Sequence, residues 1–173
     1  MISLVLGGAR SGKSAVAEAC AARLPGPVTY LATGVVTDDD MAARIAAHRA
    51  RRPASWATVE VTGDLAGTLL RIPGPVLLDA LGTWVAHDLD RIDIAALDEV
   101  CLAVARRNGD TVVVSEEVGL GVHPSSEVGR RFRDVLGHLN QRMAAQADEV
   151  LLVVAGRVLP LAPFGGPPLA EDR

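Results

Sequence analysis

The chain has 173 residues, of which 49% are hydrophobic and 22% charged, and a formal net charge of −4 at pH 7. This composition predicts a compact domain with a sizeable core and gives no general attraction to nucleic acid or to anionic lipid. No apolar run approaches the roughly 20 residues that cross a bilayer. Cys20 and Cys101 lack the spacing of a disulfide framework or a metal site and are expected to be small apolar groups. Residues 1–6 lack the basic region of a signal peptide, so we expect a cytoplasmic protein. From the apolar run lengths and the net charge we expect neither a membrane span nor a nucleic-acid partner.

Apolar runs alternate with stretches of helical character along the chain. Strands are expected at residues 2–6, 28–32, 56–61, 76–79, 111–115 and 150–154, and helices at 13–24, 40–51, 93–107 and 127–147. Such alternation predicts right-handed crossovers and a mainly parallel sheet covered on both faces. The expected fold is therefore a three-layer α/β/α sandwich formed by one domain across residues 1–173. The Pro- and Gly-rich tail from about Pro160 is expected to be poorly ordered.

A glycine-rich segment follows the first expected strand and opens the first expected helix: Gly7-Gly8-Ala9-Arg10-Ser11-Gly12-Lys13-Ser14. In this context its spacing is the P-loop pattern, in which backbone N–H groups and a helix N-terminus surround phosphate oxygens. It predicts a P-loop NTPase-like fold of the RecA-like type. Lys13, the only lysine in the chain, is expected to contact the β- and γ-phosphates, and Ser14 to offer its hydroxyl to Mg²⁺. The alternative, a glycine-rich turn without a ligand, is disfavoured by the complete motif.

An acidic residue ends the apolar run at residues 76–78. Asp79 is placed like the carboxylate that helps to hold Mg²⁺ at a neighbouring strand end of P-loop proteins. The alternative is an ordinary aspartate that caps the helix after a strand. The sequence leaves both interpretations open.

The expected helix at residues 40–51 carries basic residues and a histidine on one face. Arg44, His48 and Arg52 are spaced i, i+4 and i+8, and Arg51 lies about one turn beyond His48. Nearby guanidinium groups disfavour a protonated imidazole, which would leave His48 neutral and nucleophilic between arginines that hold phosphates. The alternative is a basic face that is only solvated.

Ordered blocks along nearly the whole chain carry a resemblance to a known family. The blocks are residues 7–14, Tyr30-Leu31-Ala32-Thr33, Asp40-Met41-Ala42-Ala43-Arg44-Ile45-x2-His48-x3-Arg52-Pro53-x2-Trp56-x-Thr58-x-Glu60, Val76-Leu77-Leu78-Asp79-x-Leu81-x-Thr83-Trp84-Val85, Val114-Ser115-x-Glu117-Val118-Gly119-x-Gly121, Arg131-Phe132-Arg133-Asp134-x2-Gly137-x2-Asn140-Gln141 and Ala155-Gly156. With these blocks the chain resembles the bifunctional adenosylcobinamide kinase/adenosylcobinamide-phosphate guanylyltransferases of cobalamin biosynthesis.

The resemblance implies two reactions. Adenosylcobinamide is phosphorylated with ATP or GTP, and GMP is then transferred from GTP to adenosylcobinamide-phosphate through a guanylylated histidine, which corresponds to His48. It also implies a homo-oligomer with sites between subunits, of which a trimer is one form. The implied nucleotide contacts are residues 7–14, Ala32, Thr33, Gly34, Arg49, Ala50, Arg51, Arg52, Glu60 and Asp79. The Glu60 carboxylate suits a guanine edge by its two acceptors, the alternative being an exposed strand carboxylate.

The chain departs from the family pattern at three positions. Gly34 stands where another small residue is frequent, Gly82 interrupts the usual Leu-Thr-Leu-Trp run, and Glu116 replaces the asparagine of a Ser-Asn-Glu-Val-Gly block. Glu116 adds a negative charge near the expected substrate cleft. This charge bears on which phosphate donor and which corrinoid are preferred, and it does not bear on the fold. Two other functions stay open: a P-loop small-molecule kinase without guanylyl transfer, and a non-catalytic GTP-binding regulatory module, which would not need His48.

Overall fold

The computed structural model describes residues 1–34, 52–61, 63–163 and 165 of the chain. Seven strands and five helices of this part are β1 (Ile2–Gly7), α1 (Lys13–Ala21), β2 (Thr29–Ala32), β3 (Ala57–Glu60), α3 (Leu65–Arg71), β4 (Val76–Asp79), α4 (Leu81–Asp88), α5 (Ile94–Arg106), β5 (Thr111–Glu116), α6 (Glu127–Gln146), β6 (Glu149–Val154) and β7 (Arg157–Pro160). The helix expected at residues 40–51 lies outside the described residues.

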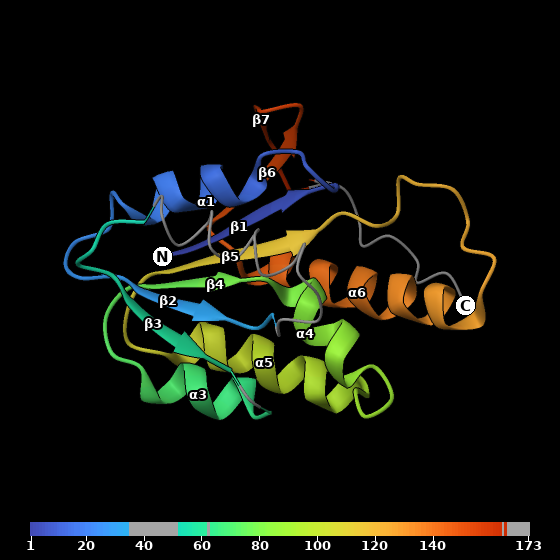
Figure 1. Ribbon diagram of the computed structural model, residues 1–173, viewed down its shortest axis with the longest axis horizontal. Helices are drawn as coiled ribbons and strands as arrows, with labels where there is room; N and C mark the ends of the chain where they lie inside the picture. The colour runs from blue at the N-terminus through green and yellow to red at the C-terminus, as the bar shows by residue number, and fades with distance from the viewer. Residues whose placement is uncertain (35–51, 62, 164, 166–173) are drawn as a thin grey trace.

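All seven strands belong to one sheet in the order β3-β2-β4-β5-β1-β6-β7. Every neighbouring pair is parallel except β6 and β7, which form an antiparallel hairpin. In Figure 1 the strands from β3 to β1 run in one direction, with α1 on one face of the sheet and α3 and α5 on the other. The predicted mainly parallel α/β sandwich is confirmed.

Strand alternation explains why both faces of the sheet are covered. On β1, Leu4 and Leu6 belong to one buried cluster and Val5 to another, because successive side chains point to opposite faces. The first cluster packs the sheet against α3, α4, α5 and α6, and the second packs it against Ala17 and Ala21 of α1. Two dry faces are the normal environment of parallel strands.

The cysteines agree with the expectation that they are small apolar groups. Cys101 is buried in the larger cluster, and burial raises the pKa of its thiol to about 11, so it stays protonated at neutral pH. Cys20 is half-buried against the smaller cluster. Both thiols are free. Among the described helices, none combines the length and apolar character that a bilayer crossing requires.

The elements that the sequence did not predict are short. The helices α3 and α4 have 7 and 8 residues, too few for a clear helical period. The strand β7 follows the turn Ala155-Gly156, in which both residues have positive φ, 49° and 74°. This is the backbone of a tight hairpin turn, but the usual Asn-Gly or Asp-Gly signal is missing. Conversely, α1 ends at Ala21, three residues before its predicted end at Leu24.

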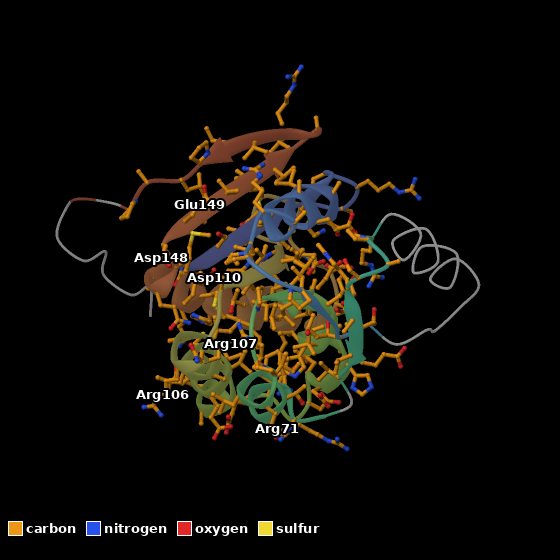
Figure 2. All side chains as sticks on the ribbon, turned by 90° about the vertical axis from the view of Figure 1, so that its left-hand side faces the viewer. Arg71, Arg106, Arg107, Asp110, Asp148 and Glu149 are labelled. Carbon is orange, nitrogen blue, oxygen red and sulfur yellow. The ribbon has the colours of Figure 1, made fainter. Side chains whose placement is uncertain are left out.

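A buried arginine clamps the edge of the sheet at which the strands begin. Arg107 is only 8% exposed, and its guanidinium donates to the carbonyls of Ile72, Gly74, Gly109 and Asp110 and to the Thr111 hydroxyl, at 2.6–3.1 Å. It thereby ties the turn before β4 to the turn before β5. Burial lowers the pKa of the guanidinium. Figure 2 looks onto this edge, with Arg107 beside the strand starts and Arg106 farther out.

Replacement of Arg107 tests this clamp. Arg107→Ala is expected to lower the free energy of unfolding by about 3 kcal/mol, because it removes the buried guanidinium that donates to carbonyls of both turns. Urea unfolding followed by circular dichroism measures the loss. The matched control is Arg106→Ala, an exposed neighbour at the end of α5, which is expected to change stability by less than about 0.5 kcal/mol. Equal unfolding midpoints for the two variants would contradict the clamp.

Candidate phosphate-binding site

Several of the described residues that were predicted to bind nucleotide lie where the parallel strands end. Gly7 at the end of β1 pairs with Glu116 of β5 and with Val153 of β6, and Ala32 at the end of β2 pairs with both Asp79 and Glu60. In open α/β sheets, ligands bind outside this carboxyl edge. The strand arrows of β1, β4 and β5 in Figure 1 point toward it.

The glycine-rich loop has the backbone that a phosphate cradle requires. Arg10 and Gly12 have positive φ, 56° and 95°, and the Ser11 N–H donates to the Gly8 carbonyl at 3.3 Å. Gly12 is the N-cap of α1 and makes no side-chain cap bond. The first N–H of α1, that of Lys13, donates to Ser11 Oγ at 3.3 Å, and the helix dipole at this end favours an anion.

Close contacts hold the loop against the sheet. A Cβ atom on Gly7 would lie 2.5 Å from Ser11 Oγ and 2.7 Å from the Val153 carbonyl, so only glycine fits there. The Gly156 N–H donates to the Ser11 carbonyl at 2.8 Å. The β6–β7 turn, whose residues Ala155-Gly156 were the last matched block, thus braces the cradle from outside.

Lys13 lies inside this cradle. Its ammonium is 3.4 Å from the Gly8 carbonyl and 3.4 Å from the Glu116 carboxylate, and its side chain is only 12% exposed. An ammonium has three N–H donors, so these contacts leave capacity for a phosphate oxygen. Ser14 follows in the first turn of α1 and is half-buried.

Asp79 is not a helix cap. It is the last residue of β4, and the N-cap of α4 is Ala80, which makes no side-chain cap bond. The Asp79 carboxylate accepts a hydrogen bond of 2.7 Å from the Tyr30 hydroxyl. Burial, and then the charge of Asp79, raises the pKa of the Tyr30 phenol, which therefore stays protonated and donates. The capping alternative for Asp79 is wrong.

Arg52 contacts the other side of Tyr30. Its guanidinium carbon lies 3.5 Å from the centroid of the Tyr30 ring, and its Nη1 donates to the Thr58 hydroxyl at 3.4 Å. Cation–π stacking of this kind holds an arginine side chain in a fixed position. Arg52, the last residue of the predicted arginine cluster, thus shares Tyr30 as a contact partner with Asp79.

Thr33 and its neighbours shape the segment after Asp79. The Thr33 hydroxyl donates to the Ala80 carbonyl at 2.6 Å, accepts from the Ala80 N–H at 3.0 Å and lies 2.5 Å from the Thr83 hydroxyl. Because this hydroxyl is engaged inside the protein, any nucleotide contact of Thr33 would come from its backbone. The contacts predicted for Ala32, Thr33 and Gly34 stay predictions.

The remaining predicted residues are placed differently. Glu60 is exposed at the end of β3, and nothing in the described part of the chain forms a hydrogen bond or ion pair with its carboxylate. Arg44, His48, Arg49, Ala50 and Arg51 lie outside the described residues. Their roles, like the guanine-reading role of Glu60, stay predictions.

Sequence reasoning missed the partner of Lys13. Glu116 and Gly82 were noticed only as separate departures from a pattern. In the structure the Glu116 carboxylate pairs with Lys13, and its second oxygen lies against Gly82. The sequence contained a hint of this contact, because a glycine and a carboxylate both depart from the expected pattern, at positions 82 and 116.

Solved structures share the fold of this protein. An ATPase of the type III secretion system of pathogenic bacteria superposes with a TM-score of 0.54 at 10% identity, over 87% of this chain and 50% of the ATPase chain. A protein from Pyrococcus horikoshii OT3 superposes with a TM-score of 0.53 at 8% identity, over 92% and 84%. Such low identities show the fold alone. Fold and loop together define a P-loop nucleotide-binding protein.

Sequence comparisons go further than the class. The family model described as cobinamide kinase/cobinamide phosphate guanyltransferase matches residues 3–161. The bifunctional adenosylcobalamin biosynthesis protein CobU of Salmonella typhimurium is 41% identical over 90% of this chain and 97% of its own length. The corresponding protein CobP of Pseudomonas aeruginosa is 42% identical over 93% and 97%. The chain belongs to the cobinamide kinase/cobinamide phosphate guanyltransferase family, which confirms the resemblance read from its motifs.

The close contact at Gly7 makes a testable prediction about the cradle. Gly7→Ala is expected to lower the thermal unfolding midpoint by several degrees, because the added methyl group must push Ser11 and the β6 backbone away at a cost of about 1–3 kcal/mol. Gly8→Ala is the matched control, since a Cβ atom there meets nothing within 4 Å. Calorimetry of the two variants decides: equal midpoints would mean that the loop is not braced at Gly7.

Proposed function

We propose that this chain catalyses both reactions named in its family's description, acting on adenosylcobinamide and then on adenosylcobinamide-phosphate. The observation that carries the proposal is the Lys13 ammonium held inside a complete glycine-rich cradle at the carboxyl edge of the sheet. Family membership supplies the substrate class. We further propose a single transferase domain that works in the cytoplasm as a homo-oligomer.

In the first reaction the cradle holds the triphosphate of ATP or GTP. The acceptor hydroxyl oxygen attacks the γ-phosphorus, the bond to the β-bridging oxygen breaks, and the nucleoside diphosphate leaves while the hydroxyl gives up its proton. Lys13 and the N–H groups of the loop stabilise the charge that moves to the bridging oxygen. The protein's contribution to this step is mainly positioning and electrostatics.

The donor groups near the cradle fit Mg²⁺. Mg²⁺ takes hard oxygen ligands and usually keeps waters and substrate phosphate oxygens, so one hydroxyl and one carboxylate suffice. Ser14 and Asp79 would hold it, the hydroxyl on the first turn of α1 and the carboxylate at the end of β4. When bound, the ion neutralises phosphate charge. Among the described residues, no group of three or more His, Cys, Asp or Glu side chains is placed to hold a metal ion.

In the second reaction His48 is the proposed nucleophile. Its imidazole nitrogen attacks the α-phosphorus of GTP, pyrophosphate leaves, and a phosphoramidate forms. A phosphate oxygen of adenosylcobinamide-phosphate then attacks the same phosphorus and releases the histidine, giving adenosylcobinamide-GDP. The arginines at 49, 51 and 52 would hold the phosphates, and the stacking of Arg52 on Tyr30 supports that placement.

The length of the edge suits a nucleotide that lies along it. From β1 to β3 the sheet has four strand spacings, which corresponds to about 19 Å. A nucleotide whose triphosphate lies in the cradle would thus extend past Asp79, with its base near Glu60 at the far end. There the exposed carboxylate can accept two hydrogen bonds from a guanine edge.

The direct test is GTP-dependent conversion of adenosylcobinamide. Purified protein with Mg²⁺ and GTP is expected to form first the phosphate and then the GDP derivative, resolved by chromatography. Lys13→Ala is expected to slow both steps by at least about 100-fold, since the same cradle holds the donor in each. Arg106→Ala, which removes an exposed cation at the opposite edge of the sheet, is the control. Normal turnover by the Lys13 variant would contradict the cradle mechanism.

A covalent label distinguishes guanylyl transfer from a simple kinase. Incubation with α-labelled GTP and Mg²⁺ is expected to attach label through an acid-labile bond, and His48→Ala is expected to abolish it. The control is His138→Ala, an exposed histidine on α6. Labelling that persists without His48 would reject it as the nucleophile. Phosphorylation without any labelling would leave a kinase alone.

A further inference from the structure

Gly82 and Glu116 lie in contact with one another, and the Glu116 carboxylate pairs with Lys13. Glu116 is the last residue of β5, and Gly82 lies in the first turn of α4. A Cβ atom built on Gly82 would overlap Glu116 Oε2 and would lie 3.3 Å from Leu136 Cδ2. The Glu116 side chain can therefore occupy its position only because residue 82 has no side chain.

The Glu116 backbone is fixed independently of its carboxylate. Its carbonyl accepts a hydrogen bond of 3.0 Å from Asn140 Nδ2, and the Asn140 Oδ1 accepts one of 2.6 Å from the Ser115 hydroxyl. The strand end is thus tied to α6, which fixes the backbone position from which the Glu116 side chain extends.

The carboxylate has two oxygens with different surroundings. Oε1 lies 3.4 Å from the Lys13 ammonium, whereas Oε2 is buried and has no hydrogen-bond partner among the described residues. A buried carboxylate oxygen without a donor is costly, and the neighbouring ammonium is what offsets that cost. The pair is therefore electrostatic and not a full hydrogen-bond network.

We propose that Gly82 and Glu116 act as one unit that positions Lys13 and cancels its charge in the empty cradle. Gly82 makes the room, and Glu116 holds the ammonium against the loop so that a remaining N–H faces the phosphate. The same carboxylate repels an incoming triphosphate, so binding is weakened until a cation accompanies the nucleotide. Glu116 is thus a positioning and affinity-setting residue, which rests on the proposed role of the cradle in binding a nucleoside triphosphate.

The single lysine of the chain allows the contact to be observed directly. Protein labelled with ¹³C-lysine gives one lysine signal set, that of Lys13. Glu116→Gln and Gly82→Thr are both expected to move its side-chain signal, because each removes the carboxylate from the ammonium. The control is Glu117→Gln, whose carboxylate accepts from the Gly119 N–H at 2.6 Å. A Lys13 signal that Glu116→Gln leaves in place would overturn the proposal.

A stability cycle tests whether the two positions are coupled. Gly82→Thr alone is expected to lower the thermal unfolding midpoint by several degrees, and the drop should be much smaller when Glu116→Asn is also present, because the shorter side chain clears the space. The double variant also keeps the test available if Gly82→Thr alone does not fold. Equal drops in both backgrounds would overturn the coupling.

Nucleotide binding tests the effect on affinity. By calorimetry in buffer with a chelator, Glu116→Gln is expected to bind GTP roughly tenfold more tightly than the unaltered protein, and the difference should shrink when Mg²⁺ is added. Equal or weaker binding by Glu116→Gln would overturn the inference while leaving the proposed function intact. If the unaltered protein does not bind GTP even with Mg²⁺, the proposed function fails, whereas the Lys13 signal still reports the contact.

Discussion

When parallel strands are buried on both faces, polar side chains can meet a ligand only at the two edges of the sheet where the strands begin and end. Here α1 covers one face and α3, α4, α5 and α6 cover the other, with apolar side chains from every central strand packed between them. The edge where the strands begin is used for structure, since Arg107 and the carboxylates of Asp110 and Asp148 hold the strand starts together. The edge where they end is left for binding. The site follows from this division.

Two cations at the binding edge each have an internal partner. Lys13 faces Glu116 across β1 and β5, and Arg52 stacks on the tyrosine that donates to Asp79. Each cation is thus held by an internal partner before any ligand arrives. Preorganised side chains of this kind lose little conformational freedom on binding, which is one way in which a small domain can handle a highly charged substrate.

The parts of this site that the sequence predicts are local in the chain. The loop at residues 7–14 is contiguous and has a strand before it and a helix after it, so spacing alone locates the cradle. Buried strands are readable from their apolar runs for the same reason. The Tyr30–Asp79 bond, the threonine pair Thr33–Thr83 and the contact of Gly82 with Glu116 join distant segments. The hydrophobic periodicity of the sequence does not predict such contacts, because they depend on the order of the strands in the sheet.

Residues 155 and 156 have a bearing on how this protein can be engineered. A tight, exposed hairpin turn is ordinarily a good place to insert a tag or to open new chain termini. In this chain the Gly156 amide donates to the carbonyl of Ser11, and Gly12 packs close to Gly156. An insertion there would loosen the phosphate cradle from behind without touching any residue that faces the ligand. Fusion partners and permuted termini belong elsewhere on the molecule.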